Sequence, residues 1–290
     1  MVTSLGALFL ETKARLLETE EPDYAEMAAR ELCCTLSGRS HAQLLAEWEN
    51  AAGEALCEKV DAGVERLLAG EPLPYVLGEW TFYGIPLVVS PQVLIPRDDT
   101  CAVAELAIHR GLFLDPDPRV LDLCCGSGCI GIALASRLKD ARVTLADLSR
   151  DALTVAKKNI QLNHLGGRVS CVQVDARKAP PAFLGKFDMI VSNPPYISEA
   201  DMEALPRSVA AFEPHMALYG GQDGLDFYRD ITHLYRGVLK PGGFLCYEFG
   251  EDQADAVCAI LEENGFTVLE RKRDFNDRER AVLAQYGRKE

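Results

Sequence analysis

The sequence has no run of about 18 apolar residues, the length that a helix needs to cross a bilayer. Its ten cysteines include no C-x-x-C pair, so the spacing typical of a structural zinc or dithiol site is missing. Positive charge is scarce, because 30 Lys and Arg face 44 Asp and Glu, for a formal net charge of −14. Proteins that bind duplex DNA usually show the opposite balance. We therefore expect no metal site, no membrane association and no direct contact with nucleic acid.

The cysteines are arranged unlike a disulfide framework. Cys33-Cys34 and Cys124-Cys125 are adjacent pairs, and most of the others lie in apolar surroundings, where free cysteine behaves as a small hydrophobic residue. Reduced thiols are typical of the cytosol. The composition thus predicts a cytoplasmic, soluble protein, with 48% apolar and 26% charged residues.

The chain of 290 residues is long enough for two domains. Its first part repeats apolar residues at helical spacing, as in Leu5, Leu8, Phe9 and Leu16. Pro72 and Pro74 end this pattern, because proline cannot continue a helical hydrogen-bond ladder. We expect a small helical bundle at 1–72, a linker with a β-hairpin turning near Tyr83-Gly84 at 73–98, and a main domain at 99–290.

From Arg119 onward, short apolar strands alternate with amphipathic helices. This alternation predicts an α/β fold with a doubly wound, mostly parallel sheet of seven strands, of which the last two could be antiparallel. The predicted strands are Arg119–Cys124, Arg142–Asp147, Val169–Val174, Phe187–Ser192, Gly243–Phe249, Thr267–Lys272 and Arg280–Gln285. The predicted helices are Thr100–Gly111, Cys129–Leu138, Arg150–Leu162, Leu225–Val238 and Gln253–Asn264.

A glycine-rich turn follows the first of these strands, at Asp122–Gly131. Gly126, Gly128 and Gly131 match the G-x-G-x-x-G spacing that places a pyrophosphate at a helix N-terminus, so a nicotinamide enzyme has to be considered. Asp122 argues against it, because a carboxylate there would repel pyrophosphate but would accept hydrogen bonds from the turn or from a ligand amine. The turn therefore favours a nucleotide cofactor with a zwitterionic amino-acid tail.

Acidic residues end the next two strands on the same edge of the predicted sheet, where open α/β folds bind ligands. Asp147 suits ribose hydroxyls in either class of cofactor. Asp175, followed by Ala176, suits the adenine amino group, although a plain helix-cap or turn role has comparable weight.

The fourth strand delivers Asn193-Pro194-Pro195-Tyr196 to that same edge. An amino nitrogen conjugated to a carbonyl or ring is a poor nucleophile. The side-chain oxygen of Asn193 and the carbonyl of Pro194 can each accept a hydrogen bond from one N–H of this amino nitrogen. These bonds stabilise the positive charge that develops on the nitrogen during methyl transfer. Tyr196 can stack on the flat amide or base. The motif thus predicts an S-adenosylmethionine-dependent N-methyltransferase, and it needs no histidine base because the cationic product nitrogen loses its proton to water.

Together, these residues resemble the class I methyltransferases that modify planar amino groups, and within them the HemK/PrmC family of release factor N5-glutamine methyltransferases. The resemblance covers nearly the whole chain. It includes Glu71–Gly78, Val93–Arg97, Phe212–Pro214, Gly220–Tyr228, Glu248–Gly250 and a closing hairpin at Arg273–Arg280.

The resemblance implies that S-adenosylmethionine donates a methyl group to the side-chain nitrogen of the glutamine in the Gly-Gly-Gln motif of class I release factors. It also implies that the helical bundle helps dock the release factor. By position, the resemblance implies that Asn193, Pro194 and Tyr196 are catalytic and that these three residues bind the substrate together with Pro195. The expected cofactor residues are Asp122, Cys124, Cys125, Gly126, Ser127, Gly128, Asp147, Asp175, Ala176 and Asn193.

The chain departs from the family pattern at three places. Cys124-Cys125 stands where the family usually has Gly-Thr, so Cys124 lacks the backbone freedom of glycine. Asp98–Cys101 replaces the more common Pro-Glu-Thr-Glu and is assigned no role. Ala176 is smaller than the residue often found there.

Other functions remain open at this stage. A sister enzyme could methylate a glutamine of a ribosomal protein, and an adenine-N6 methyltransferase would use the same motif on a similar planar amine. The acidic charge and the lack of a basic target-recognition domain argue against the latter. A non-catalytic nucleotide-binding module is disfavoured by the intact Asn-Pro-Pro-Tyr motif.

Overall fold

The computed structural model describes residues 3–287. It divides into two compact units. The first comprises the residues up to Gly78 together with Arg207–Phe212, and the second comprises Glu79–Pro206 and the residues from Glu213 onward. No helix within residues 3–287 is long and apolar enough to cross a membrane.

The first unit is helical, as predicted. Capping defines where its helices begin. The Ser4 hydroxyl accepts from the backbone N–H of Ala7, and Ser40 and Gln43 form a reciprocal capping box. Its core consists of fully buried aliphatic residues such as Leu16, Leu32 and Leu44. The helices are α1 (Leu5–Leu16), α2 (Pro22–Ser37), α3 (His41–Ala46), α4 (Glu54–Leu68), α5 (Leu73–Leu77) and α10 (Arg207–Phe212).

Helix α5 lies within the segment that the sequence assigns to a linker. The prolines that stop α4 also start α5, since a helix tolerates proline in its first turn. Arg66 fixes the short helix, because its guanidinium donates to the carbonyls of Tyr75 (3.0 Å) and Val76 (3.1 Å). The same guanidinium pairs with Glu71 at 2.6 Å. The helical unit therefore extends to Gly78.

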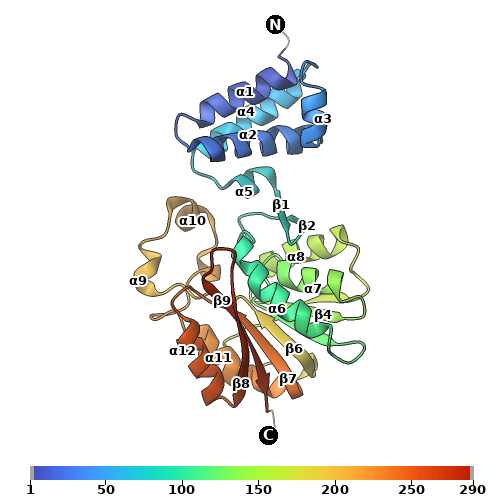
Figure 1. Cartoon of the computed structure of the whole chain (residues 1–290), viewed down its shortest axis with the longest axis vertical. Coiled ribbons are helices and arrows are strands. Elements are labelled where there is room, and N and C mark those ends of the chain that lie inside the picture. Colours follow the sequence, from blue (N-terminus) through green and yellow to red (C-terminus); the bar gives the residue numbers. More distant parts are fainter. Residues whose placement is uncertain (1–2, 288–290) are drawn as a thin grey trace. The chain divides into compact units, whose positions relative to one another are not determined.

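The second unit is built on a seven-stranded sheet with the order β5-β4-β3-β6-β7-β9-β8 (Figure 1). The first five strands in this order run parallel, and β9 pairs antiparallel with both β7 and β8. This arrangement confirms the predicted doubly wound sheet with an antiparallel final pair. The strands are β3 (Arg119–Leu123), β4 (Arg142–Asp147), β5 (Val169–Gln173), β6 (Phe187–Ser192), β7 (Leu239–Glu248), β8 (Phe266–Arg273) and β9 (Glu279–Tyr286).

Helices cover both faces of this sheet (Figure 1). Alternate residues of each strand point to opposite faces, so Val120 of β3 packs into one core cluster and Leu121 into the other. Both residues are fully buried, as expected for a parallel sheet with two covered faces. One face carries α6 (Cys101–Gly111), α7 (Cys129–Arg137) and α8 (Arg150–Leu162), and the other carries α11 (Asp226–Tyr235) and α12 (Ala254–Glu263).

The predicted hairpin forms between β1 (Glu79–Phe82) and β2 (Ile85–Val88). Tyr83 and Gly84 both have positive φ, as a tight two-residue hairpin turn requires. The hairpin belongs to the second unit, where buried Asn159 of α8 holds it. The Asn159 side chain accepts from the Val88 N–H (2.6 Å) and donates to the carbonyls of Val88 and Ser127 (both 3.0 Å).

Some boundaries differ from the sequence prediction. Strand β7 begins at Leu239 and not at Gly243, because Gly242 adopts a positive φ and a bulge lets pairing with β6 extend back past the Pro-Gly-Gly break. Helix α11 ends at Tyr235, and the predicted remainder is a short 3₁₀ turn, Arg236–Val238. The short helix α9 (Glu199–Met202) and 3₁₀ turns at Asp98–Thr100, Ala182–Leu184 and His215–Ala217 are additional.

Candidate active site

A cavity of about 460 Å³ lies in the second unit, at the carboxyl ends of the parallel strands. Strand β3 has β4 on one side and β6 on the other, so the strand order reverses here, where open α/β sheets bind ligands. The volume lies in the range of small-molecule sites. Nine sequence-predicted residues line it: Cys124, Cys125, Gly126, Ser127, Asp147, Asp175, Ala176, Asn193 and Pro195. Asp122, Gly128, Pro194 and Tyr196 are not among the lining residues.

The register of the sheet brings three of the lining residues together. Leu123 of β3 stands level with Ala146 of β4 and with Ser192 of β6. The residues that follow these three positions, Cys124, Asp147 and Asn193, therefore emerge side by side at one edge. The Ser192 hydroxyl, donating to the carbonyl of Leu123 at 2.6 Å, locks the β3–β6 contact.

Asp147 is held by the turn that it faces. One carboxylate oxygen accepts from the Gly126 N–H and the other from the Ser149 N–H, both at 2.9 Å. Burial raises the pKa of this carboxyl, while these backbone hydrogen bonds oppose the rise. Because each carboxylate oxygen has more than one lone pair, the cavity-lining Asp147 can still accept hydroxyl groups of a ligand.

Asp122 lies fully buried beneath the turn. Its Oδ2 accepts from the Gly131 N–H in the first turn of α7 at 2.8 Å, which is the turn contact that the sequence suggests. Within the described residues its Oδ1 has no hydrogen-bond partner. Burial raises the pKa of Asp122 to about 7.

Cys124 adopts a left-handed backbone conformation, with φ of 60°. The turn thus keeps a geometry that suits glycine although a cysteine stands there. A side chain in this region costs about 1 kcal/mol or more. The departure from Gly-Thr is therefore accommodated as local strain at the edge of the cavity.

Replacing Cys124 by glycine should relieve this strain, whereas replacement by alanine should keep it. We expect Cys124→Gly to exceed Cys124→Ala in free energy of unfolding by about 1 kcal/mol, which reverses the usual order of the two residues. Both variants lose the thiol, so chemical denaturation of the pair isolates the backbone effect. A more stable alanine variant would show that the turn is not strained at Cys124.

Asp175 lines the cavity and also closes its own turn. It accepts from the Arg177 N–H at 3.0 Å and pairs with Lys178 at 3.1 Å. Burial would raise its pKa, but these two contacts outweigh burial and lower it. Ala176 is buried beside it. The structural role in the turn and a ligand contact are thus compatible at Asp175.

The Asn193–Tyr196 segment is packed against a glycine-rich loop. A Cβ at Gly220 would lie 2.7 Å from both the Pro195 carbonyl oxygen and the Tyr196 Cα, which explains why glycine stands there. The Tyr196 carbonyl accepts from the Gln253 side chain at 2.9 Å. Pro194 is buried, and the side chain of Tyr196 packs against the core under α11 and α12. The Asn193–Tyr196 segment is therefore held by close packing and by a hydrogen bond to its backbone.

Several residues at the site have no predicted role. Thr100 lines the cavity and accepts from the Asn193 carboxamide nitrogen at 3.4 Å. Buried Glu213, whose carboxylate pairs with Arg97, ties together two walls of the cavity. Those walls are formed by residues of the 92–96 and 214–217 segments. Both segments overlap stretches of family resemblance, but neither has a chemical signature that sequence alone would reveal.

The described residues offer no set of metal ligands at this cavity. Within residues 3–287, no group of three or more His, Cys, Asp or Glu side chains is placed to hold a metal ion. The polar groups around the cavity include the carboxylates of Asp147 and Asp175, the carboxamides of Gln92 and Asn193, hydroxyl and thiol groups, and the side chains of Arg177 and His215. Such groups bind and orient a ligand by hydrogen bonds.

Comparison with known proteins identifies the family to which the chain belongs. Residues 109–211 match the family described as methyltransferase small domain, and residues 8–78 match the PrmC N-terminal domain. A release factor glutamine methyltransferase of Chlorobaculum tepidum is 36% identical over 284 residues, which cover 95% of this chain and 96% of the relative. One of Bordetella pertussis is 41% identical over 263 residues, which cover 90% and 94% of the two chains.

Among solved structures, a methyltransferase from Pyrococcus furiosus aligns with a TM-score of 0.51 at 16% identity. The alignment covers 78% of this chain and 98% of that one. This likeness bears on the fold alone, which is that of a class I methyltransferase. With both family matches and relatives above 30% identity over nearly the full length, the chain belongs to the family of release factor glutamine methyltransferases.

Proposed function

We propose that this protein uses S-adenosylmethionine to methylate the side-chain amide nitrogen of the glutamine in the Gly-Gly-Gln motif of class I release factors. The observation that supports the proposal most directly is the placement of Asn193. The β3–β6 register sets its carboxamide at the cavity beside the Cys124–Ser127 turn and Asp147. In this proposal, the carboxamide that would accept the substrate N–H and the edge that would bind the cofactor lie at one cavity.

The residues around the cavity fit this cofactor. The cavity volume of about 460 Å³ lies in the range of sites that bind small molecules such as S-adenosylmethionine. A Cβ at Gly126 would meet nothing within 4 Å, so the backbone of the turn is open to a ligand. We propose that Asp147 accepts the ribose hydroxyls and that Asp175 with Ala176 borders the adenine. The lining part of the turn, Cys124–Ser127, would hold the amino-acid portion, with buried Asp122 and Gly128 shaping the turn from below.

When bound, S-adenosylmethionine supplies an electrophilic methyl group. The chain's own part is to hold the amide nitrogen in line with that methyl group. We propose that the Asn193 side-chain oxygen and the Pro194 carbonyl each accept a hydrogen bond from one N–H of the amide, and that Pro195 and Tyr196 keep the amide plane fixed. Of these four residues, Asn193 and Pro195 line the cavity, and Pro194 and Tyr196 adjoin them in the chain. These acceptors stabilise the positive charge that develops on nitrogen, and the product then releases a proton to water.

For the first unit we propose a role in docking the release factor. The support is the match of residues 8–78 to the PrmC N-terminal domain and the absence of cavity-lining residues from this unit in the described chain. The remaining part, from Glu79, would carry the chemistry, with the β1–β2 hairpin as part of it.

The test is label transfer from methyl-labelled S-adenosylmethionine to a release factor, a release factor with Gly-Gly-Asn in place of Gly-Gly-Gln, ribosomal proteins and DNA. We expect label only in the release factor that keeps its glutamine. Label in a ribosomal protein would favour the sister enzyme. Label in DNA without label in the Gly-Gly-Gln loop would contradict the proposed function.

A further inference from the structure

Glu248 is a buried carboxylate near Asn193 of the Asn193–Tyr196 segment. Glu248, the last residue of β7, is only 2% exposed and does not line the cavity. Burial raises its pKa to about 7, although hydrogen bonds from the side chains of Thr100 and Asn193 act in the opposite direction. Within the described chain its Oε2 has no hydrogen-bond partner. Burial of a carboxyl group with one oxygen unpartnered costs desolvation free energy.

The neighbours of Glu248 determine how the Asn193 carboxamide is turned. A carboxamide has one accepting oxygen and one donating NH₂ group. The Thr100 hydroxyl accepts from the Asn193 Nδ2 at 3.4 Å, so its own hydrogen is left to donate, and an ionised Glu248 carboxylate nearby can only accept. Both neighbours therefore require the NH₂ group of Asn193 on their side. Its oxygen Oδ1 is left for the cavity that Asn193 lines.

We propose that Glu248 is a positioning residue which, through Thr100 and directly, orients the Asn193 carboxamide so that Oδ1 faces the substrate amide. The inference rests on the proposed function, since the oriented oxygen serves to accept a substrate N–H. Protonation of Glu248 would cancel the orientation. The carboxyl would then be a donor itself, and the Thr100 hydroxyl hydrogen would be free to bond to Oδ1.

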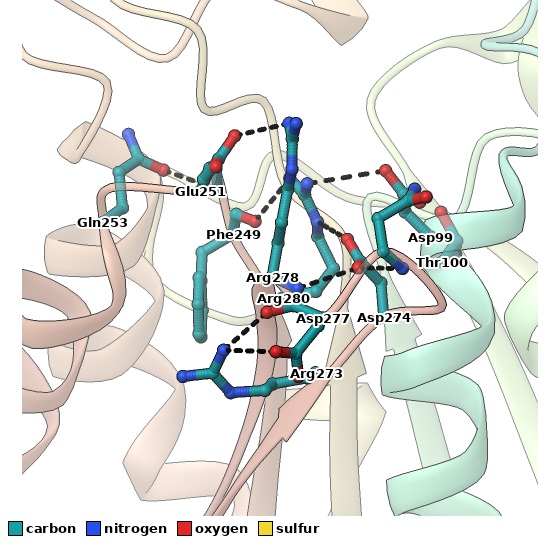
Figure 2. A network of polar contacts seen from close by, with 12 residues as sticks. Asp99, Thr100, Phe249, Glu251, Gln253, Arg273, Asp274, Asp277, Arg278 and Arg280 are labelled. Carbon is teal, nitrogen blue, oxygen red and sulfur yellow. Dashed lines mark hydrogen bonds and ion pairs between the residues drawn. The ribbon is translucent and has the colours of Figure 1, made fainter.

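A fixed cation helps keep Glu248 ionised. Arg280 of β9 favours the charged carboxylate, whereas Asp99 disfavours it. Figure 2 shows how the guanidinium is held: it donates to Asp274 (3.2 Å) and to the Phe249 carbonyl (3.3 Å), and it pairs with Asp99 (3.5 Å). The other titratable groups that act on Glu248, or on which it acts, have raised pKa values and are neutral near pH 7: Tyr196, Tyr228, Cys101 and Cys129.

The orientation predicts a particular pH dependence of turnover. Because the ionised form of Glu248 orients Asn193, wild-type kcat should fall as the pH drops through about 7. In Glu248→Gln this acid limb should disappear, and kcat at pH 8 should be about tenfold below wild type, since a neutral side chain selects the orientation less well. The Kd of S-adenosylmethionine should stay within about twofold of wild type, since Glu248 lies outside the cavity.

Two further variants separate orientation from packing. Thr100→Val keeps the shape but removes the hydroxyl, so it should also lower kcat about tenfold. Thr100→Ser should restore most of that loss. Asp122→Asn tests whether the other buried carboxyl with a pKa of about 7 causes the acid limb; because Asp122 shapes the cofactor turn, only the pH at which kcat falls is compared, and not the size of kcat. This variant should keep the acid limb.

A measurement without turnover tests the same point. The side-chain NH₂ signals of Asn193 in a ¹⁵N–¹H spectrum, assigned by their loss in Asn193→Ala, should titrate near pH 7 in wild type and in Asp122→Asn. They should not titrate there in Glu248→Gln. An unchanged acid limb and an unchanged titration in Glu248→Gln would overturn the inference. Failure of the wild type to label the release factor would instead overturn the proposed function, and the NMR titration would still decide the role of Glu248.

Discussion

Asn193→Ala should lower kcat by about a thousandfold, the loss expected when a preorganised group that stabilises developing charge is removed. Asn193 is half-buried at the cavity, between the Cys124 turn and Thr100. Alanine leaves the substrate nitrogen with one acceptor fewer and with less restraint on its direction. Single-turnover assays with labelled S-adenosylmethionine and a release factor measure the effect.

The cofactor should still bind to Asn193→Ala, with a Kd raised by no more than about threefold, because the turn and Asp147 are untouched. Gln161→Ala, an exposed amide on α8, serves as the matched control and should leave turnover unchanged. If Asn193→Ala turned over at the wild-type rate, the proposed amide contact would be wrong.

Asp147→Ala should weaken S-adenosylmethionine binding by about a hundredfold, because hydrogen bonds to a charged acceptor contribute about 1.5–3 kcal/mol each. The same change leaves the N–H groups of Gly126 and Ser149 without their acceptor, so the free energy of unfolding should fall by about 2 kcal/mol. Titration calorimetry and chemical denaturation give the two numbers.

Asp147→Asn tests whether charge or shape matters, since it keeps one accepting oxygen. Its Kd should rise by about tenfold, between wild type and alanine. Asp151→Ala removes an exposed carboxylate four residues further on, in the first turn of α8, and should change neither quantity. Equal affinities for wild type and Asp147→Ala would exclude Asp147 as a cofactor ligand.

Local patterns in the sequence account for much of the fold. Strands β4 and β6 and helix α8 begin and end where the sequence predicts. Each is bounded by strong local signals, such as the Ser149 cap at the start of α8. Strand β7 was predicted less well, because pairing with β6 outweighs the local preference of Pro-Gly-Gly for a turn.

In the candidate site, too, some features follow from local patterns and others depend on long-range packing. The glycine turn, Asp147 and the Asn193–Tyr196 segment are local motifs at strand ends, and a parallel sheet gathers its strand ends at one edge. The sequence could not show that Asp122 lies beneath the cavity and not in its lining, because its neighbours α7 and β4 enclose it only in the folded chain.

By itself, the sequence determined the two-part organisation, the parallel sheet and the Asn193–Tyr196 motif at its edge, because each depends on a short pattern. Only the tertiary structure decided which residues stand behind that motif. Thr100 is 93 positions from Asn193, and Glu248 and Arg280 come from β7 and β9. No periodicity or spacing links them. The order and register of strands bring Glu248 and Arg280 to this edge, and the packing of the Asp98–Thr100 turn adds Thr100; both depend on long-range contacts.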